Sequence, residues 1–154
     1  MSSFKIKIGT QDNLDILVRH RLNMWREIYP EMENDIKASE EMTRRWILDK
    51  LKEGKLIPFI AIAGDGQIAG SGCVLIKEDQ PRPGSSQIDN PYLLSMYTEG
   101  TFRRLGVATN ITREAISWCK NKGYDRMTLH ASAQGKPIYQ KLGFVDSNEM
   151  RLML

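Results

Sequence analysis

Apolar residues recur along this chain with two different spacings, and each spacing predicts one kind of secondary structure. Residues 4–8 alternate apolar side chains with lysines, which is the two-residue period of a strand with one buried face. Over residues 14–28 the apolar side chains recur every three or four positions, the pattern of one face of a helix that ends before Pro30. Residues 30–37 are mostly polar and are expected to be a connection. A similar apolar pattern then predicts a second helix between Ser39, a favourable N-cap residue, and Gly54, a favourable residue after a helix end.

Three strands are expected in the middle of the chain. The apolar stretches 57–63 and 67–76 flank an Asp-Gly pair, which is typical of a tight turn between antiparallel strands. Residues 92–98 form a third strand-like stretch. The segment 77–91 before it is rich in proline, glycine and serine, so we expect an exposed loop there.

The last third of the chain predicts two helices and two strands. A long helix ends at about Lys122, and it is followed by a strand over 126–131, a short helix over 136–142 and a closing strand over 150–154. The element order is therefore β-α-α-β-β-β-α-β-α-β over a single domain, residues 1–154. This order predicts an α/β (α+β) fold with a central mixed, mostly antiparallel sheet of six to seven strands and helices on both faces.

Length and composition are those of an ordinary globular protein, with 154 residues of which 41% are hydrophobic and 27% charged. The apolar stretches are too short to span a membrane, and the N-terminus lacks the apolar core of a secretion signal. We therefore expect a cytoplasmic protein with no membrane partner. Cys73 and Cys119 stand apart without a CxxC pair or a nearby histidine, which favours reduced packing residues, and we expect no bound metal.

The formal net charge of +3 is concentrated in one segment of the chain. Residues 99–126 hold six basic and three acidic residues, so this segment carries +3 and the rest of the chain is neutral. Such a segment attracts a polyanionic ligand, and the alternative is a solvated helix face. The basic residues are few and no aromatic RNA-binding motif accompanies them, so we expect no nucleic-acid partner.

The central feature of the sequence is a strand that leads into a glycine-containing turn and a helix. Residues 103–108, Arg-Arg-Leu-Gly-Val-Ala, follow the strand 92–98. The first N–H groups of a helix lack partners and carry partial positive charge, which suits a phosphate, and the small Gly106 and Ala108 allow close approach. A P-loop protein needs a lysine after the glycines, and a dinucleotide-binding protein needs Gly-x-Gly-x-x-Gly near an early strand. Both motifs are absent.

Two motifs together resemble those of one known superfamily. Residues 103–108 resemble the Gln/Arg-x-x-Gly-x-Gly/Ala motif of the GNAT acetyltransferases, and residues 139–144, Tyr-Gln-Lys-Leu-Gly-Phe, are similar to their Tyr-x-x-x-Gly-Phe signature. The order and separation of the motifs also match, and the predicted element order matches the GNAT fold. The resemblance implies that acetyl-CoA is the co-substrate.

The resemblance also implies where acetyl-CoA binds. Backbone groups of residues 96–98 would pair with the pantetheine, and backbone N–H groups of residues 104–109 would hold the pyrophosphate. Many members carry an asparagine before the second motif, whereas this chain offers Ser132 or Gln134. The implied cofactor-binding residues are Met96, Tyr97, Thr98, Arg103, Arg104, Leu105, Gly106, Val107, Ala108, Thr109 and Ser132.

By the same resemblance Tyr139 is the general acid, because a phenol with an ordinary pKa of about 10 is protonated at neutral pH and can give its proton to a thiolate. A packing role for this tyrosine is the alternative. The base that takes the proton of the amine stays open among Glu27, Glu31, Glu99 and His130, although a structural role is favoured for His130. Loss of this proton to water is the further alternative.

The resemblance implies an acyltransferase in which a primary amine attacks acetyl-CoA directly in a ternary complex, an N-acetyltransferase. A non-catalytic acyl-CoA-binding sensor on the same fold is the alternative. The acceptor stays open among a small amine, a polyamine, an amino acid and a protein amino group. A homodimer is the common default assembly for soluble enzymes.

Overall fold

The computed structural model describes residues 3–154, and their strands form one sheet in the order β1-β2-β3-β4-β5. The first four strands are antiparallel neighbours, whereas β5 runs parallel to β4, which confirms the predicted mixed, mostly antiparallel sheet. The strands are β1 (Lys5–Ile8), β2 (Leu56–Ile62), β3 (Ile68–Glu78), β4 (Asp89–Thr98) and β5 (Thr128–Leu129).

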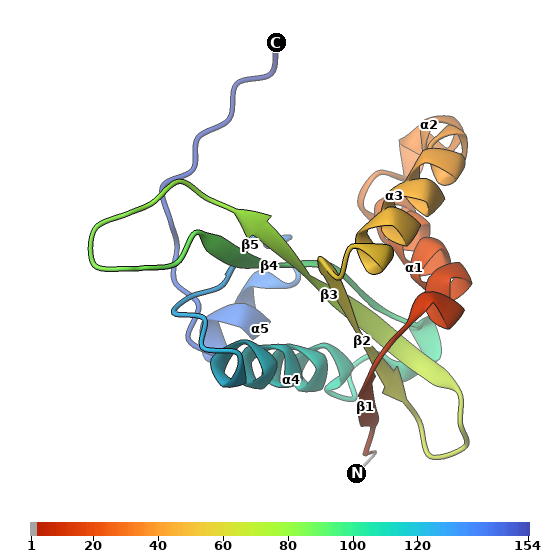
Figure 1. The fold of residues 1–154 in the computed structure, drawn as a ribbon. Helices are drawn as coiled ribbons and strands as arrows, with labels where there is room; N and C mark the ends of the chain where they lie inside the picture. The colour runs from red at the N-terminus through yellow and green to blue at the C-terminus, as the bar shows by residue number, and fades with distance from the viewer. Residues whose placement is uncertain (1–2) are drawn as a thin grey trace.

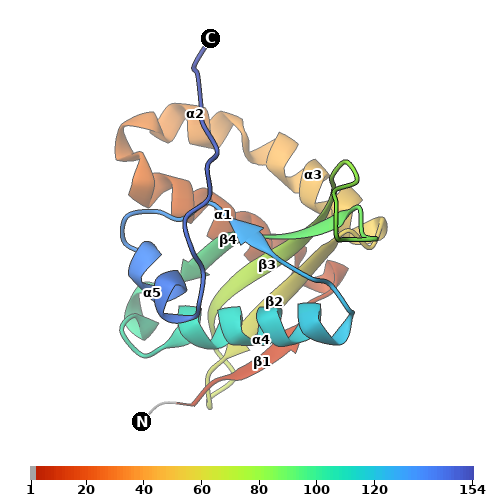
Figure 2. The ribbon, with the colours of Figure 1, turned by 90° about the vertical axis from the view of Figure 1, so that its left-hand side faces the viewer.

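Helices cover both faces of the sheet, as predicted (Figures 1 and 2). One face carries α1 (Leu14–Ile28), α2 (Glu33–Ala38) and α3 (Glu40–Lys52), and the other carries α4 (Val107–Asn121), with α5 (Lys136–Lys141) beside it. Short 3-10 turns are η1 (Gln11–Asn13), η2 (Pro30–Met32) and η3 (Gly100–Phe102). Every helix in the described part of the chain is too short or too polar to cross a bilayer.

Each face of the sheet has its own apolar core, and one cysteine lies in each. Helix α4 closes the first core, whose buried residues are Phe59, Ala61, Ala69, Val74, Leu93, Val107, Ile111, Ala115 and Cys119. Helices α1, α2 and α3 enclose the second, whose buried residues are Leu17, Val18, Leu22, Ile36, Ile47, Leu56, Ile60 and Cys73. Because the central strands are buried on both faces, their sequences are continuously apolar rather than alternating. Both free cysteines are packing residues, as predicted.

The predicted closing strand is wrong, and the predicted six to seven strands are not confirmed. Residues 144–154 form no helix or strand, and Met150, Leu152 and Leu154 are exposed on a segment that runs away from the sheet (Figure 1). A strand forms only where a neighbouring strand satisfies its N–H and C=O groups. The strand predicted over 126–131 is reduced to the two residues of β5, so this edge of the sheet is too short to pair with another full strand.

The predicted connection after the first helix contains a further helix. Residues 30–37 were expected to be a polar connection, but η2 and α2 lie there, so three helices rather than two separate β1 from β2. Only Ile36 of α2 is buried. A single buried residue sets no period, and the sequence pattern therefore does not reveal this helix.

Strand β4 carries a bulge near its end. Ser71 of β3 pairs with Tyr97, and Cys73 pairs with Leu94, so β4 has one more residue than β3 between these two pairs. Ser95 lies in this interval and has a φ of 59°, a left-handed value that is uncommon for a residue with a side chain. The bulge therefore changes the direction in which residues 96–98 present their groups.

Beyond this bulge, one edge of β4 is open. β5 pairs with residues 92–93 of β4, and within residues 3–154 no strand pairs with residues 94–98 on that side. On the other side β3 lies very close, because a Cβ atom on Gly70 would be 2.6 Å from the carbonyl oxygen of Tyr97. The end of β4 is therefore held firmly by β3 and offers free backbone groups along its outer edge.

Candidate active site

A cleft of about 650 Å³ opens at the free edge of β4. Its walls are the C-terminal half of α1, the end of β4, the turn that leads into α4, and the loop and helix α5. It is lined by Met24, Glu27, Ile28, Met96, Tyr97, Thr98, Phe102, Arg103, Arg104, Gly106, Val107, Ala108, Thr109, Ser132, Ala133, Gln134, Gly135, Ile138 and Tyr139. The structure thus brings together all of the predicted cofactor and acid residues except Leu105, which is exposed outside the cleft lining.

Helix α4 begins at this cleft with an uncapped N-terminus. Its N-cap residue is Gly106, whose φ of 84° is in the left-handed region that favours glycine. No side chain among the described residues caps the helix, and the N–H of Asn110 donates to the carbonyl of Gly106 at 2.9 Å. The N–H groups of residues 107–109 therefore have no acceptor within the helix. A Cβ atom on Gly106 would meet nothing within 4 Å, so an anion has room to approach them.

Tyr139 reaches the cleft from α5 and is half-buried. Its ring packs edge-on against Phe144 with the centroids 5.8 Å apart, and it also packs against the core beneath α4. Gly135 leaves room for this ring, because a Cβ atom there would lie 3.1 Å from a ring carbon. Burial raises the pKa of Tyr139 above its ordinary value, so its hydroxyl is protonated at neutral pH. The packing role and the position of an acid are therefore compatible.

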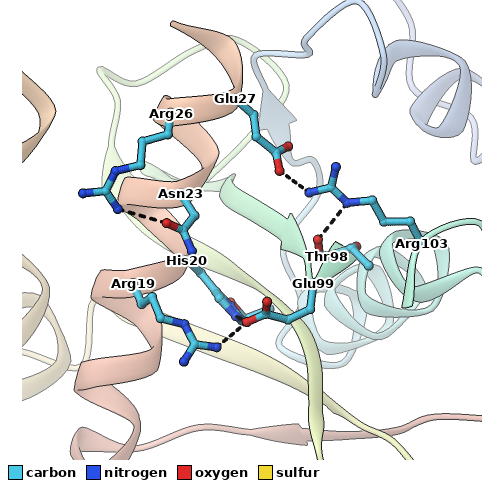
Figure 3. A network of polar contacts seen from close by, with 9 residues as sticks. Arg19, His20, Asn23, Arg26, Glu27, Thr98, Glu99 and Arg103 are labelled. Atoms are coloured by element: carbon cyan, nitrogen blue, oxygen red, sulfur yellow. Dashed lines mark hydrogen bonds and ion pairs between the residues drawn. The ribbon is translucent and has the colours of Figure 1, made fainter. Parts of the chain in front are cut away.

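An ion pair joins α1 to the turn before α4 (Figure 3). The Arg103 guanidinium donates through Nη2 to Glu27 Oε1 and through Nε to the carbonyl oxygen of Thr98, the latter at 3.0 Å. The guanidinium carbon also lies 5.5 Å from the centre of the Tyr97 ring. The Glu27 carboxylate raises the pKa of Arg103, which stays charged. Arg103, one of the implied cofactor-binding residues, is thus engaged by a carboxylate in this structure.

A buried histidine network lies between α1 and the end of β4 (Figure 3). His20 is 1% exposed, and its Nδ1 and Nε2 atoms lie 2.6 Å from Ser71 Oγ and 3.0 Å from Glu99 Oε1. Burial lowers the pKa of His20 by more than the bond to Glu99 raises it, so the ring is neutral at neutral pH. Burial acts to raise the pKa of Glu99, but the hydrogen bonds from Arg19 and His20 lower it on balance. A carboxylate only accepts, so Nε2 donates to Glu99 and the Ser71 hydroxyl donates to Nδ1.

The four candidates for the base differ in whether they line the cleft. Glu27 lines it, whereas Glu31 is exposed on η2 and does not. Glu99 is held in the histidine network behind β4. His130 lies outside the cleft lining and hydrogen-bonds to Tyr92, in keeping with the structural role that the sequence favours.

Sequence reasoning did not predict the contacts of His20 or the pairing of Glu27 with Arg103. Their partners lie 51 to 79 positions away along the chain, so no local spacing records them. One signal was present, because His20 lies three residues after Leu17 on the apolar face of the predicted helix. A polar residue on such a face indicates a buried hydrogen-bond partner.

The same architecture occurs in solved structures of acetyltransferases. A GCN5-related N-acetyltransferase from Ralstonia eutropha JMP134 is 23% identical over 99% of each chain, with a TM-score of 0.90. A predicted acetyltransferase with acetyl-CoA from Clostridium acetobutylicum is 24% identical over 99% of this chain and 96% of that one, with a TM-score of 0.85. An aminoglycoside N-acetyltransferase in complex with CoA is 22% identical over 100% and 95%, with a TM-score of 0.67. At these identities the likeness shows the fold.

A comparison with family models agrees with this fold. A search of curated protein sequences finds no significant match. The model of the acetyltransferase (GNAT) domain, in contrast, matches residues 32–152, which is most of the chain and includes every wall of the cleft except α1. Both motifs, at residues 103–108 and 139–144, fall inside the matched range. The chain therefore belongs to the GNAT acetyltransferase family.

Proposed function

We propose that this protein transfers the acetyl group of acetyl-CoA to a primary amine while both substrates are bound. The observation that carries the proposal is the meeting, in one cleft, of a free strand edge, an uncapped helix N-terminus and the protonated Tyr139. Each of these features suits a different part of acetyl-CoA.

The cleft residues fit acetyl-CoA by their chemistry. The open edge of residues 96–98 offers backbone groups to the amides of the pantetheine, as a neighbouring strand would. The free N–H groups of residues 107–109 suit the pyrophosphate, with Arg104 at the same turn. Ser132 Oγ accepts a hydrogen bond from the N–H of Gly135, and its own hydroxyl proton stays available to the cofactor.

The chain's own residues would position and stabilise the reaction. Acetyl-CoA supplies an activated thioester, and its reaction with an amine forms an amide and releases a thiol. A backbone N–H near Met96 or Tyr97 would polarise the thioester carbonyl as negative charge develops on its oxygen. Tyr139 would donate its hydroxyl proton to the departing sulfur. The amine would release one proton to solvent when the amide forms, and solvent would return one proton to Tyr139.

The acceptor is proposed to be an amine. The solved aminoglycoside acetyltransferase of similar fold acts on an amine by its description, which supports this class without selecting a member of it. A small amine, a polyamine, an amino acid and a protein amino group stay as the possible acceptors. The cytoplasmic location and the homodimer stay predictions.

The test is a screen for acceptor-dependent thiol release. The protein is mixed with acetyl-CoA and a panel of amines, and free thiol is followed with a thiol-reactive dye. We expect at least one amine to raise the rate well above that of hydrolysis, with acetylated amine formed in equal amount. If acetyl-CoA binds by calorimetry but no amine releases thiol, the protein is a sensor and the proposal is wrong.

A variant of the helix start tests the cofactor site separately. Gly106→Val places a β-branched residue at a φ of 84° and fills the space in front of the free N–H groups. We expect the affinity for CoA to fall by about tenfold or more, which corresponds to about 1.4 kcal/mol, because the valine side chain keeps the pyrophosphate away from these N–H groups. Gly100→Ala is the control, because a Cβ atom there meets nothing within 4 Å and its φ is not left-handed. Equal affinities in the two variants would contradict this site.

A further inference from the structure

The Arg103 side chain contacts two groups that the proposed reaction would use. Its Nε donates to the carbonyl of Thr98, which belongs to the strand edge proposed for pantetheine, and its Nη2 donates to Glu27. If pantetheine pairs with Thr98, one of the two contacts that hold the guanidinium beside Glu27 is lost. A pyrophosphate at the start of α4 then offers the same guanidinium a partner of higher charge. Cofactor binding would therefore draw Arg103 away from Glu27.

Departure of Arg103 leaves the Glu27 carboxylate without a cation. Arg103 is the sole cationic side chain that contacts Glu27 in residues 3–154. The neighbours of Glu27 along the cleft wall formed by α1 are Met24 and Ile28, whose side chains offer no hydrogen bond to a carboxylate. A carboxylate on a concave, partly apolar wall binds a cation more strongly than one in open water does. Once the cofactor is bound and Arg103 has left, the cleft would therefore present Glu27 as a site for a cation.

The segment that follows Glu27 along the chain is also acidic. Residues 27–35 contain four acidic residues and no basic residue, although the whole chain carries +3. One of the four, Glu33, is paired with Arg26. This end of α1 therefore attracts cations, whereas the turn at Arg103 and Arg104 attracts anions. Of the four acidic residues, Glu27 is the one that lines the cleft, so its side of the cleft suits a cation and the side of the turn suits an anion.

We propose that Glu27 binds an ammonium group of the acceptor, and that Arg103 occupies this carboxylate until the cofactor binds. The inference rests on the proposed function. An amine must be neutral to attack a thioester, so the ammonium that stays charged on Glu27 is a second one on the same molecule. The acceptor class is therefore a diamine or a polyamine, bound after acetyl-CoA.

The proposal requires that the two ligands help one another to bind. A diamine competes with Arg103 for Glu27 in the free protein, but not in the protein that holds CoA. An exposed ion pair of this kind changes a binding constant by about two- to fivefold. By linkage, the diamine strengthens CoA binding by the same factor as CoA strengthens diamine binding.

Calorimetry with 1,4-diaminobutane measures this coupling without turnover. The diamine is titrated into the full chain alone and into the chain saturated with CoA, which carries no acetyl group. We expect binding to be about two- to fivefold tighter in the presence of CoA. In Glu27→Gln the diamine should bind weakly under both conditions, and CoA should bind tighter than to the wild type because Arg103 is free. Glu31→Gln is the matched control, since Glu31 does not line the cleft, and it should keep the coupling.

Three results would overturn the inference. The first is equal diamine affinity with and without CoA in the wild type, and the second is full coupling in Glu27→Gln. Butylamine, which lacks the second ammonium, should bind about two- to fivefold more weakly than the diamine to the CoA-loaded wild type, and equal binding is the third result. Thiol release is measured separately. Coupling without turnover supports the inference and contradicts the proposed reaction, whereas turnover without coupling overturns the inference alone.

Discussion

Replacement of Gly70 by alanine should both destabilise the fold and damage the cofactor edge. Gly70 is buried in β3, opposite Thr98 of β4. An added Cβ atom would lie 2.6 Å from the carbonyl oxygen of Tyr97 and 2.9 Å from a methyl group of Val107, well inside the 3.4 Å at which ordinary contact begins. Val107 is 2% exposed in the α4 core, and the carbonyl belongs to the backbone. Moving either neighbour would therefore disturb the packed core or the backbone of β4.

The expected magnitude follows from these two contacts. Overpacking of a dense core by one methyl group costs about 1–3 kcal/mol, while alanine in place of glycine recovers about 0.5–1 kcal/mol of chain entropy. A net loss of about 1–2 kcal/mol lowers the melting temperature of a chain of this size by roughly 2–8 °C. Because the displaced carbonyl lies on the strand that faces the cleft, we also expect CoA affinity to fall.

Thermal unfolding followed by circular dichroism, with calorimetric titration of CoA, measures both effects. Gly64→Ala is the matched control, because Gly64 is exposed in the hairpin turn, has no left-handed φ, and a Cβ atom there would meet nothing within 4 Å. This control should stay within about 0.5 kcal/mol of the wild type. Equal melting temperatures and CoA affinities for the two variants would refute the argument that β3 holds β4 in place at Gly70.

Three further predictions follow from the site. Tyr139→Phe should lower kcat by about 10²-fold at unchanged CoA affinity, and because burial raises the pKa of Tyr139, the alkaline loss of wild-type turnover should begin above pH 10; unchanged turnover in the variant would exclude Tyr139 as the acid. Burial lowers the pKa of His20 below 6.5, so the unfolded chain takes up this proton first as the pH falls, and the stability that neutral His20 contributes above pH 6.5 is lost below it. Denaturant titrations at several pH values should show this fall in the free energy of unfolding in the wild type and in His130→Asn but not in His20→Asn. Arg104→Ala should weaken CoA binding less than Gly106→Val does by calorimetry, because Arg104 is exposed.

Local sequence patterns were sufficient to predict the elements that bury a regular stripe of side chains. The helix predicted over 14–28 is α1, Leu14–Ile28, and the hairpin predicted over 57–76 corresponds to β2 and β3. In both cases the period of the apolar residues records which face is buried. The same pattern was insufficient for α2 and for the C-terminal segment. Helix α2 has one buried residue, and the apolar residues after 144 find no neighbour to pair with.

The amino-acid sequence alone was enough to predict the principal elements and, through the two motifs, the family and the candidate cofactor residues. These features are local, because the residues that form a helix stripe or a glycine turn lie within about twenty positions of one another along the chain. Which distant side chains come into contact depends instead on how the elements pack. Glu27 and Arg103, and likewise His20 and Glu99, are brought together only when α1 packs against the end of β4, and no spacing along the chain encodes that contact. The position of Glu27 in the cleft, and the diamine inferred from it, therefore depend on the fold.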